Sequence, residues 1–149
     1  MVRRLWFSFL VPLTVFGQQW SRLSDFPGSK RDDGAAAVLN GRAYFGTGLQ
    51  EGWTSTSDWY SFDLYTLAWK KLPDMPPSTG RQYACGFSAL NSIFIFGGDA
   101  YGGRNDMFRY DPVEEKWQGC AAKPGAGVMA AASMTFGDKV FFYRRKSAS

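Results

Sequence analysis

The sequence predicts an all-β protein built from repeated units of four short antiparallel strands. Short apolar runs such as Ile93–Phe96 are rich in β-branched and aromatic residues and stop at glycines or polar turn residues. Seventeen glycines and seven prolines fit many turns between short strands. Trp20, Trp69 and Trp117 recur at spacings of 49 and 48 residues, which indicates a repeated structural unit.

The clearest unit runs from Arg81 to about Cys120. Its first strand-like run reaches the polar pair Asn91-Ser92, which we interpret as a turn, and a second run, Ile93–Phe96, stops at Gly97-Gly98. Asp111-Pro112 is a further turn signal, because aspartate accepts hydrogen bonds from the backbone ahead of it and proline fixes φ. An ordinary antiparallel meander is the alternative interpretation of this segment alone.

The double glycine, followed by Tyr110 and Trp117 with six residues between them, resembles the kelch repeat. That resemblance implies a β-propeller, whose blades need neighbours to bury their faces. We expect an incomplete kelch propeller over residues 18–149: blade one at about 31–72, blade two at about 81–120 and half a blade at about 125–143. Closed propellers have about four to eight blades. The chain is therefore expected to be a piece of a longer gene product, or to close by self-association.

Residues 1–17 have the pattern of a secretory signal peptide. Arg3 and Arg4 precede an apolar run from Leu5 to Phe16 that is too short to span a bilayer comfortably. We expect cleavage after Gly17, a secreted or periplasmic location, and no membrane attachment afterwards. A buried N-terminal strand and an uncleaved anchor are the alternatives.

The first unit should contain its strands in the same order as the second. Ala35–Leu39 is expected to be the inner strand, because its small side chains suit the crowded centre of a propeller. Asn40-Gly41 predicts a type I′ hairpin turn into a second strand, Arg42–Phe45. The outer strands are expected at Asp58–Asp63 and Ala68–Leu72.

Strand fragments flank these units. Trp20–Leu23 matches the start of the outer strand at Trp69, so the resemblance implies that it completes the last blade of a closed ring. Val128–Phe136 and Lys139–Tyr143 are expected to be the two inner strands of the half blade, and the repeat pattern is lost after Tyr143. Blade one would then lack a neighbour over its outer face, and open blade edges would favour self-association.

Composition excludes several kinds of site. The formal net charge is +4, from 17 basic and 13 acidic residues, but the basic residues do not cluster as a nucleic-acid-binding face requires. The absence of histidine excludes Ser-His-Asp, Cys-His and His-metal sites, and two cysteines cannot form a zinc site. We therefore expect no nucleic-acid partner, no metal, no cofactor and no catalytic residue in this chain.

Cys85 and Cys120 are predicted to remain unbridged. The repeat places Cys85 on an inner strand and Cys120 on an outer strand. Two strands then lie between them at about 5 Å per step, which is beyond disulfide reach. Both side chains are expected to act as small buried hydrophobic groups.

Eight residues are candidates for ligand binding. Arg31 and Arg81 recur at the entrance to the inner strands, where the kelch resemblance implies arginines that project into the pore and contact ligands; the alternative is a structural arginine bonded to loop carbonyls. The third unit has Gly125–Gly127 there instead. Exposed loop aromatics suit carbohydrate or peptide recognition, and the alternative for Trp53 is packing against its own blade. The candidates are Arg31, Asp32, Trp53, Arg81, Gln82, Tyr83, Tyr101 and Arg104.

These features predict an exported kelch-repeat module that binds a protein or glycan ligand through loops at one face. The alternative is the N-terminal fragment of a kelch enzyme, because the chain is also similar to the periplasmic sialic-acid mutarotases, or N-acetylneuraminate epimerases. The shared features are Arg-Asp or Arg-Gln at the start of inner strands, Phe-Gly-Gly at the end of one, and residues 123–129. That resemblance implies a general acid/base and a cation supplied by later blades. The galactose oxidases, a third kelch group, need histidine to bind copper, and histidine is absent.

Overall fold

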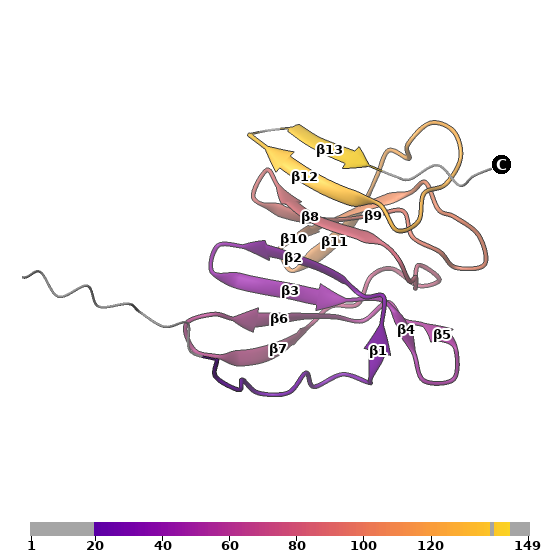
Figure 1. Ribbon diagram of the computed structural model, residues 1–149. Helices are drawn as coiled ribbons and strands as arrows, with labels where there is room; N and C mark the ends of the chain where they lie inside the picture. Colours follow the sequence, from indigo (N-terminus) through magenta and orange to yellow (C-terminus); the bar gives the residue numbers. More distant parts are fainter. Residues whose placement is uncertain (1–19, 138, 144–149) are drawn as a thin grey trace, which may run out of the picture.

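The computed structural model describes residues 20–137 and 139–143, and every regular element in these residues is a β-strand (Figure 1). Two four-stranded antiparallel sheets, ordered β2-β3-β6-β7 and β8-β9-β10-β11, form the first and second blades. A two-stranded sheet, β12-β13, follows, and a small sheet, β1-β4-β5, accompanies the first blade. The predicted all-β class is therefore confirmed. The strands are β1 (Arg31–Asp32), β2 (Ala35–Leu39), β3 (Arg42–Gly46), β4 (Leu49–Gln50), β5 (Thr54–Ser55), β6 (Trp59–Asp63), β7 (Ala68–Leu72), β8 (Cys85–Ala89), β9 (Ser92–Phe96), β10 (Met107–Asp111), β11 (Lys116–Cys120), β12 (Ala132–Phe136) and β13 (Lys139–Tyr143).

The two four-stranded sheets and the β12-β13 sheet lie one above another (Figure 1). Their inner strands are in contact, β2 with β8 and β8 with β12. Gly86 shows how closely two of these strands approach, because a Cβ atom there would lie 2.5 Å from the carbonyl oxygen of Ala36. A larger residue would push the inner strands apart. This close approach brings the loops at the strand ends of neighbouring blades together.

Apolar side chains fill both spaces between the sheets. The first and second blades enclose one cluster, which contains Ala35, Tyr44, Trp59, Leu72, Met75, Ile93, Ile95 and Tyr110. The second blade and the β12-β13 sheet enclose another, where the ring of Phe142 lies 4.7 Å from that of Phe96 and 5.3 Å from that of Phe87. Large aromatic side chains thus contribute to the contacts on both faces of the second blade.

The hairpin turns between inner strands follow the repeat. Asn40 and Gly41 both have positive φ, at 49° and 73°, which agrees with the predicted type I′ turn. In the second blade the turn residues are Leu90 and Asn91, at 49° and 54°, so the expected turn at Asn91-Ser92 is wrong by one residue. Ser92 already belongs to β9, because the spacing of 50 residues is preserved through this hairpin.

The N-terminal segment differs from expectation. Residues 20–23 form no strand, and Trp20 is 91% exposed. The segment instead follows the first blade: Trp69 Nε1 donates a hydrogen bond to the carbonyl of Ser24, and the ring of Phe26 packs 5.2 Å from that of Trp69 and 4.9 Å from that of Tyr60. The expectation of an uncovered outer face on blade one is therefore wrong at Phe26. The predicted signal peptide at 1–17 lies outside the described residues.

The third sheet begins later than expected. Its inner strand starts at Ala132 rather than Val128, because Val128 forms an isolated bridge with Arg104 of the preceding blade. One face of the sheet contacts the second blade. The other face exposes Met134, Phe136, Phe141 and Tyr143. Among the described residues, no strand pairs with the outer edge of β13.

The two cysteines are free, as predicted. Cys85 of β8 pairs with Phe96, Phe96 with Met107, and Met107 with Cys120 of β11. The two thiols therefore lie at opposite edges of the second blade with two strands between them.

Candidate functional site

Each four-stranded blade contains a buried arginine that forms a bidentate ion pair with an aspartate. In the second blade, Nη1 and Nη2 of Arg81 donate to Oδ1 and Oδ2 of Asp106 at 2.7 and 3.0 Å. In the first blade, Nη2 of Arg31 donates to Oδ2 of Asp58 at 2.7 Å, and Nη1 contacts the other carboxylate oxygen. The side chains of Arg81 and Arg31 are 0% and 2% exposed.

Backbone carbonyls complete the environment of both guanidinium groups. In each blade Nε donates to the residue two positions before the arginine, and Nη1 donates to the residue that follows β3 or β9. The acceptors are Ser29 and Thr47 in the first blade and Thr79 and Gly97 in the second. This is the geometry of a structural arginine bonded to loop carbonyls, which was the second of the two alternatives for Arg31 and Arg81.

The ion pairs also set the charge state of the aspartates. Burial raises the pKa of Asp106, but the hydrogen bonds and positive charges of Arg81 and Arg104 outweigh burial and hold that pKa below its ordinary value of 3.8. Asp58 shows the same balance with Arg31. Both carboxylates are therefore ionised at neutral pH. The two pairs fix the entrances to the inner strands, where the neighbouring candidate residues lie.

Val128 occupies the corresponding position in the third unit. The backbone N–H of Gly48 donates to the carbonyl of Arg81 at 2.7 Å, and that of Gly98 donates to the carbonyl of Val128 at 2.7 Å. These equivalent bonds align Val128 with Arg81, so the expected alignment of Gly125–Gly127 with the arginine is wrong. The third unit still lacks the arginine, and Val128 is buried in the apolar cluster instead.

A row of backbone hydrogen bonds joins the three inner-strand entrances. The N–H of Tyr83 donates to the carbonyl of Asp33, and the N–H of Ala130 donates to the carbonyl of Tyr83, both at 3.0 Å. All three residues have positive φ, at 54°, 55° and 51° for Asp33, Tyr83 and Ala130. This conformation costs non-glycine residues about 1 kcal/mol or more, so the surrounding structure must impose it. It places the side chains of Asp33 and Tyr83 side by side on adjacent blades.

A cleft of about 530 Å³ opens between the loops of the first and second blades, and we call it the interblade cleft. Five of the eight predicted ligand-binding residues line it: Asp32, Trp53, Gln82, Tyr83 and Tyr101. The others that line it are Asp33, Leu49, Ser55, Asp99 and Ala100. The structure thus brings together residues that are up to 69 positions apart in the sequence.

Three aromatic side chains in the interblade cleft are accessible to solvent. Trp53 is 85% exposed, Tyr101 is fully exposed and Tyr83 is 40% exposed. Trp53 lies between β4 and β5 with φ of 58°, and its exposure excludes the alternative in which it packs against its own blade. Large exposed rings are typical of recognition surfaces, since they offer contact area at low entropic cost.

Three carboxylates lie among these rings. The hydrogen bond between the Tyr83 hydroxyl and Asp33, together with the negative charge of Asp33, raises the pKa of Tyr83. Oδ1 of Asp99 accepts a hydrogen bond from the backbone N–H of Gly102 at 2.5 Å. Among the described residues that line the interblade cleft, there is no lysine or arginine. Asp99 was not predicted; its only sequence signal is its position directly after the glycine pair.

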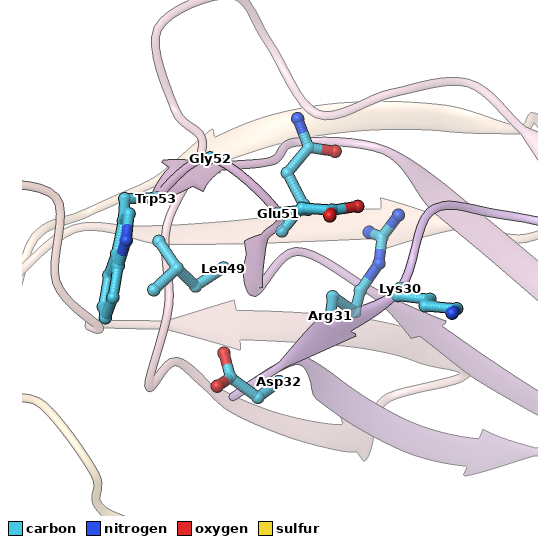
Figure 2. Close-up of a pocket in the computed structure, with 8 residues that line it drawn as sticks. Lys30, Arg31, Asp32, Leu49, Glu51, Gly52 and Trp53 are labelled. Carbon is cyan, nitrogen blue, oxygen red and sulfur yellow. The ribbon is translucent and has the colours of Figure 1, made fainter.

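A second hollow, of about 540 Å³, shares Asp32, Leu49 and Trp53 with the interblade cleft. Figure 2 shows Trp53 and Leu49 side by side at one end of it, and Arg31 and Lys30 at the other. Four of its eight lining residues belong to strands β1 and β4, and three more form the turn between β4 and β5, so the loop that ends in Trp53 contributes to both hollows. Because the Arg31 guanidinium is held by Asp58, the charges at this hollow that have no ion-pair partner come from Lys30, Asp32 and Glu51.

Arg104, the remaining candidate, lies apart from the interblade cleft. Its Nη1 lies 3.4 Å from Asp106, and its Nη2 donates to the carbonyl of Ser78 at 3.3 Å. Its side chain is 27% exposed. The structure therefore associates Arg104 with the buried ion pair of the second blade.

The described residues contain no group of three or more His, Cys, Asp or Glu side chains that could hold a metal ion. They also contain no helix long and apolar enough to cross a membrane.

The fold matches that of a solved structure. The solved structure of YjhT superposes on 80% of this chain with a TM-score of 0.68 and 21% sequence identity, and the match covers 35% of YjhT. The chain is a partial kelch-type propeller. No family model matches its sequence.

Curated relatives give a more specific likeness. The chain is 30% identical over 95 residues to proteins named N-acetylneuraminate epimerase from two strains of Haemophilus influenzae, PittEE and 86-028NP. It is 24% identical over 112 residues to the protein of that name from Yersinia enterocolitica. The matches cover 61% and 68% of this chain. The chain spans only about a quarter of the length of these relatives, 25% and 27%.

Proposed function

We propose that this chain is part of an exported, ligand-binding propeller and that the interblade cleft is its binding site for a peptide or glycan. One observation carries the proposal: Trp53 and Tyr101, on loops of two different blades, both expose their rings at the same cleft. Ring faces can stack on the apolar face of a sugar or on a peptide side chain. Loops on a rigid β-scaffold are also where binding residues concentrate.

Polar groups around the rings can provide specificity. The carboxylates of Asp32 and Asp99 can accept hydrogen bonds from a ligand, and the Gln82 amide can both donate and accept. The Tyr83 hydroxyl is already hydrogen-bonded to Asp33, so it positions that carboxylate. A few polar groups in a cleft with aromatic walls are typical of ligand sites.

Glycan and peptide arrays probed with the full chain test this proposal. We expect Trp53→Ala and Tyr101→Ala each to reduce the signal of bound ligands several-fold, since removing a central aromatic contact costs about 1–2 kcal/mol. Trp20→Ala and Tyr65→Ala are matched controls, because these rings are 91% and 86% exposed but lie outside the interblade cleft. Equal losses in all four variants, or binding that none of them affects, would rule out the site.

A second candidate function is supported by the curated relatives named N-acetylneuraminate epimerase. In this proposal the chain supplies the first blades of a related enzyme, and a general acid/base and a cation are supplied by later blades. The nucleotide sequence after the codon for Ser149 tests it. Further kelch blades with a glutamate and an arginine directed at the pore would support it, and their absence would leave the binding module. We expect the chain alone to show no mutarotation of N-acetylneuraminate above the uncatalysed rate.

A further inference from the structure

We propose that the interblade cleft selects a positively charged organic group, an ammonium or a guanidinium, as the part of the ligand that it binds. The inference rests on the proposed function, because it uses the same cleft. It adds the charge of the ligand, which the likeness to other propellers does not supply. Two observations carry it: the carboxylates of the cleft have no lysine or arginine partner, and the aromatic rings beside them are exposed.

The carboxylates of the interblade cleft differ from most others in the described residues. Of the twelve Asp and Glu residues that the structure describes, eight form ion pairs with lysine or arginine. The four that do not are Asp32, Asp33, Glu51 and Asp99. Three of these four line the interblade cleft, and Glu51 lines the adjoining hollow. Negative charge without an ion-pair partner is therefore concentrated at one place on a chain whose formal net charge is +4.

The groups that do contact these carboxylates are neutral. Asp33 accepts a hydrogen bond from the Tyr83 hydroxyl, and Asp99 accepts one from the backbone N–H of Gly102. Such hydrogen bonds stabilise an ionised carboxylate without cancelling its charge. By contrast, Asp58 and Asp106, a short distance along the same loops, are each neutralised by an arginine. The interblade cleft thus keeps a negative potential that attracts cations and repels anions.

The aromatic walls favour the same sign of charge. A cation placed over the face of a tryptophan or tyrosine is attracted by the ring quadrupole, and tryptophan is the best of these rings. Trp53 and Tyr101 present exposed rings from adjacent blades, and the partly exposed ring of Tyr83 lines the same cleft. Rings and carboxylates together can surround an ammonium or guanidinium that keeps part of its hydration.

Two other ligand types fit less well. An anionic ligand, such as a sugar carboxylate, would meet three carboxylates and no described lysine or arginine in the cleft. A metal ion needs several carboxylate oxygens to converge, and no such group occurs in the described residues. The volume of about 530 Å³ suits an organic group with its own apolar surface.

Saturation-transfer difference NMR on the full chain provides the test, because it measures weak binding and tolerates associated protein. Choline is compared with 3,3-dimethylbutan-1-ol, an isostere in which a carbon atom replaces the charged nitrogen. We expect choline to bind at least about threefold more tightly than this neutral isostere. N-acetyl-lysine amide and N-acetyl-arginine amide, used in parallel, show whether side chains of a basic peptide or a free small cation are preferred.

Variants assign the effect to the cleft. Asp32→Asn and Asp99→Asn should each weaken choline binding about threefold and leave the isostere unchanged, while Trp53→Ala should weaken both. Asp25→Asn is the control, because Asp25 is exposed and paired with Arg22 outside the cleft. Circular dichroism of each variant checks folding, and two independent aspartate variants guard against the misfolding of one.

The outcomes separate the two proposals. If the isostere binds as tightly as choline, or N-acetylneuraminate binds more tightly at Trp53, the charge inference is overturned while the binding site stands. If cations bind but Trp53→Ala and both aspartate variants leave their affinity unchanged, the inference is also overturned. If no cation, neutral isostere, peptide or glycan shows binding that depends on Trp53 and Tyr101, the proposed function itself fails.

Discussion

Arg81, whose side chain is fully buried, forms a bidentate ion pair with Asp106 at 2.7 and 3.0 Å, and the same pair recurs 50 and 48 residues earlier as Arg31 and Asp58. In each blade the pair joins the entrance of the inner strand to the residue just before the third strand. Because the arginine also bonds to two backbone carbonyls, it satisfies buried polar groups in a loop region with little regular structure. The ion pair therefore recurs in both blades although the arginine and aspartate are 27 residues apart in the first blade and 25 in the second.

Arg81→Ala should lower the free energy of unfolding by about 3 kcal/mol, because it removes both close hydrogen bonds to Asp106 and leaves two carbonyls without their side-chain donor. Urea unfolding followed by circular dichroism measures the loss. Arg104→Ala is the matched control: Arg104 contacts the same carboxylate at 3.4 Å from a partly exposed position, so its loss should be below about 1 kcal/mol. Similar losses in both variants would contradict a special role for the buried arginine.

Stability should decrease in acid. The pKa values of Asp58 and Asp106 in the folded state lie below the ordinary value of 3.8, so the unfolded chain takes up protons first as the pH falls. The stabilisation is therefore present above about pH 5 and is lost as the pH falls through 3.8 and then through the folded pKa values. The slope of unfolding free energy against pH should become shallower in Asp106→Asn. An unchanged slope in that variant would show that the pair does not carry the acid sensitivity.

Tyr110→Phe should stabilise the chain by about 1 kcal/mol. The Tyr110 side chain is fully buried, its hydroxyl has no hydrogen-bond partner among the described residues, and burial raises its pKa. Phenylalanine keeps the ring contacts with Tyr44 and Trp117 at 6.1 and 5.0 Å and removes the unpaired hydroxyl. Tyr110→Leu, which loses both ring contacts, should be destabilising. Thermal unfolding of the two variants decides the matter, and a loss of stability in Tyr110→Phe would mean that the hydroxyl is hydrogen-bonded in solution.

Thiol counting under denaturing, non-reducing conditions should find two thiols per chain, because Cys85 and Cys120 lie at opposite edges of one sheet. In the native protein, Cys85 should react slowly with alkylating reagents, since it is 6% exposed and burial raises its pKa. Monomeric protein with no free thiols would be incompatible with this strand order.

The chain should associate in solution. The outer face of the β12-β13 sheet exposes Phe136 and Phe141, which are 80% and 53% accessible, beside a strand edge that pairs with no other described strand. Light scattering should show oligomers, and the double variant Phe136→Lys, Phe141→Lys should shift them towards monomers. Leu64→Lys, at an exposed hairpin of the first blade, is the control and should change nothing. A wild-type monomer with a single cooperative unfolding transition would refute this expectation.

The sequence alone determined the strand order within each blade. The period near 50, the Asn40-Gly41 turn and the β-branched run Ile93–Phe96 are local or repeated patterns, and strand pairing within a blade depends mainly on such short-range signals. The free cysteines followed from the same alignment. Five of the eight candidate residues lie at one cleft because they precede inner strands or occupy the long loops, and both positions can be recognised in the repeat.

Only the tertiary structure decided which side chains turn inward. Arg31 and Asp32 are adjacent in the sequence, yet the first is held in an ion pair and the second is exposed at the interblade cleft. The repeat pattern could not predict which of the two side chains is buried. Strand β1 is only two residues long, so the direction of each side chain depends on which face of the strand contacts the neighbouring loop. The same holds for Phe26, which covers the first blade, and for Asp99, which becomes a cleft residue only through its bridge to Gln82. Contacts between loops of different blades depend on how closely the inner strands pack, and the packed core determines that distance.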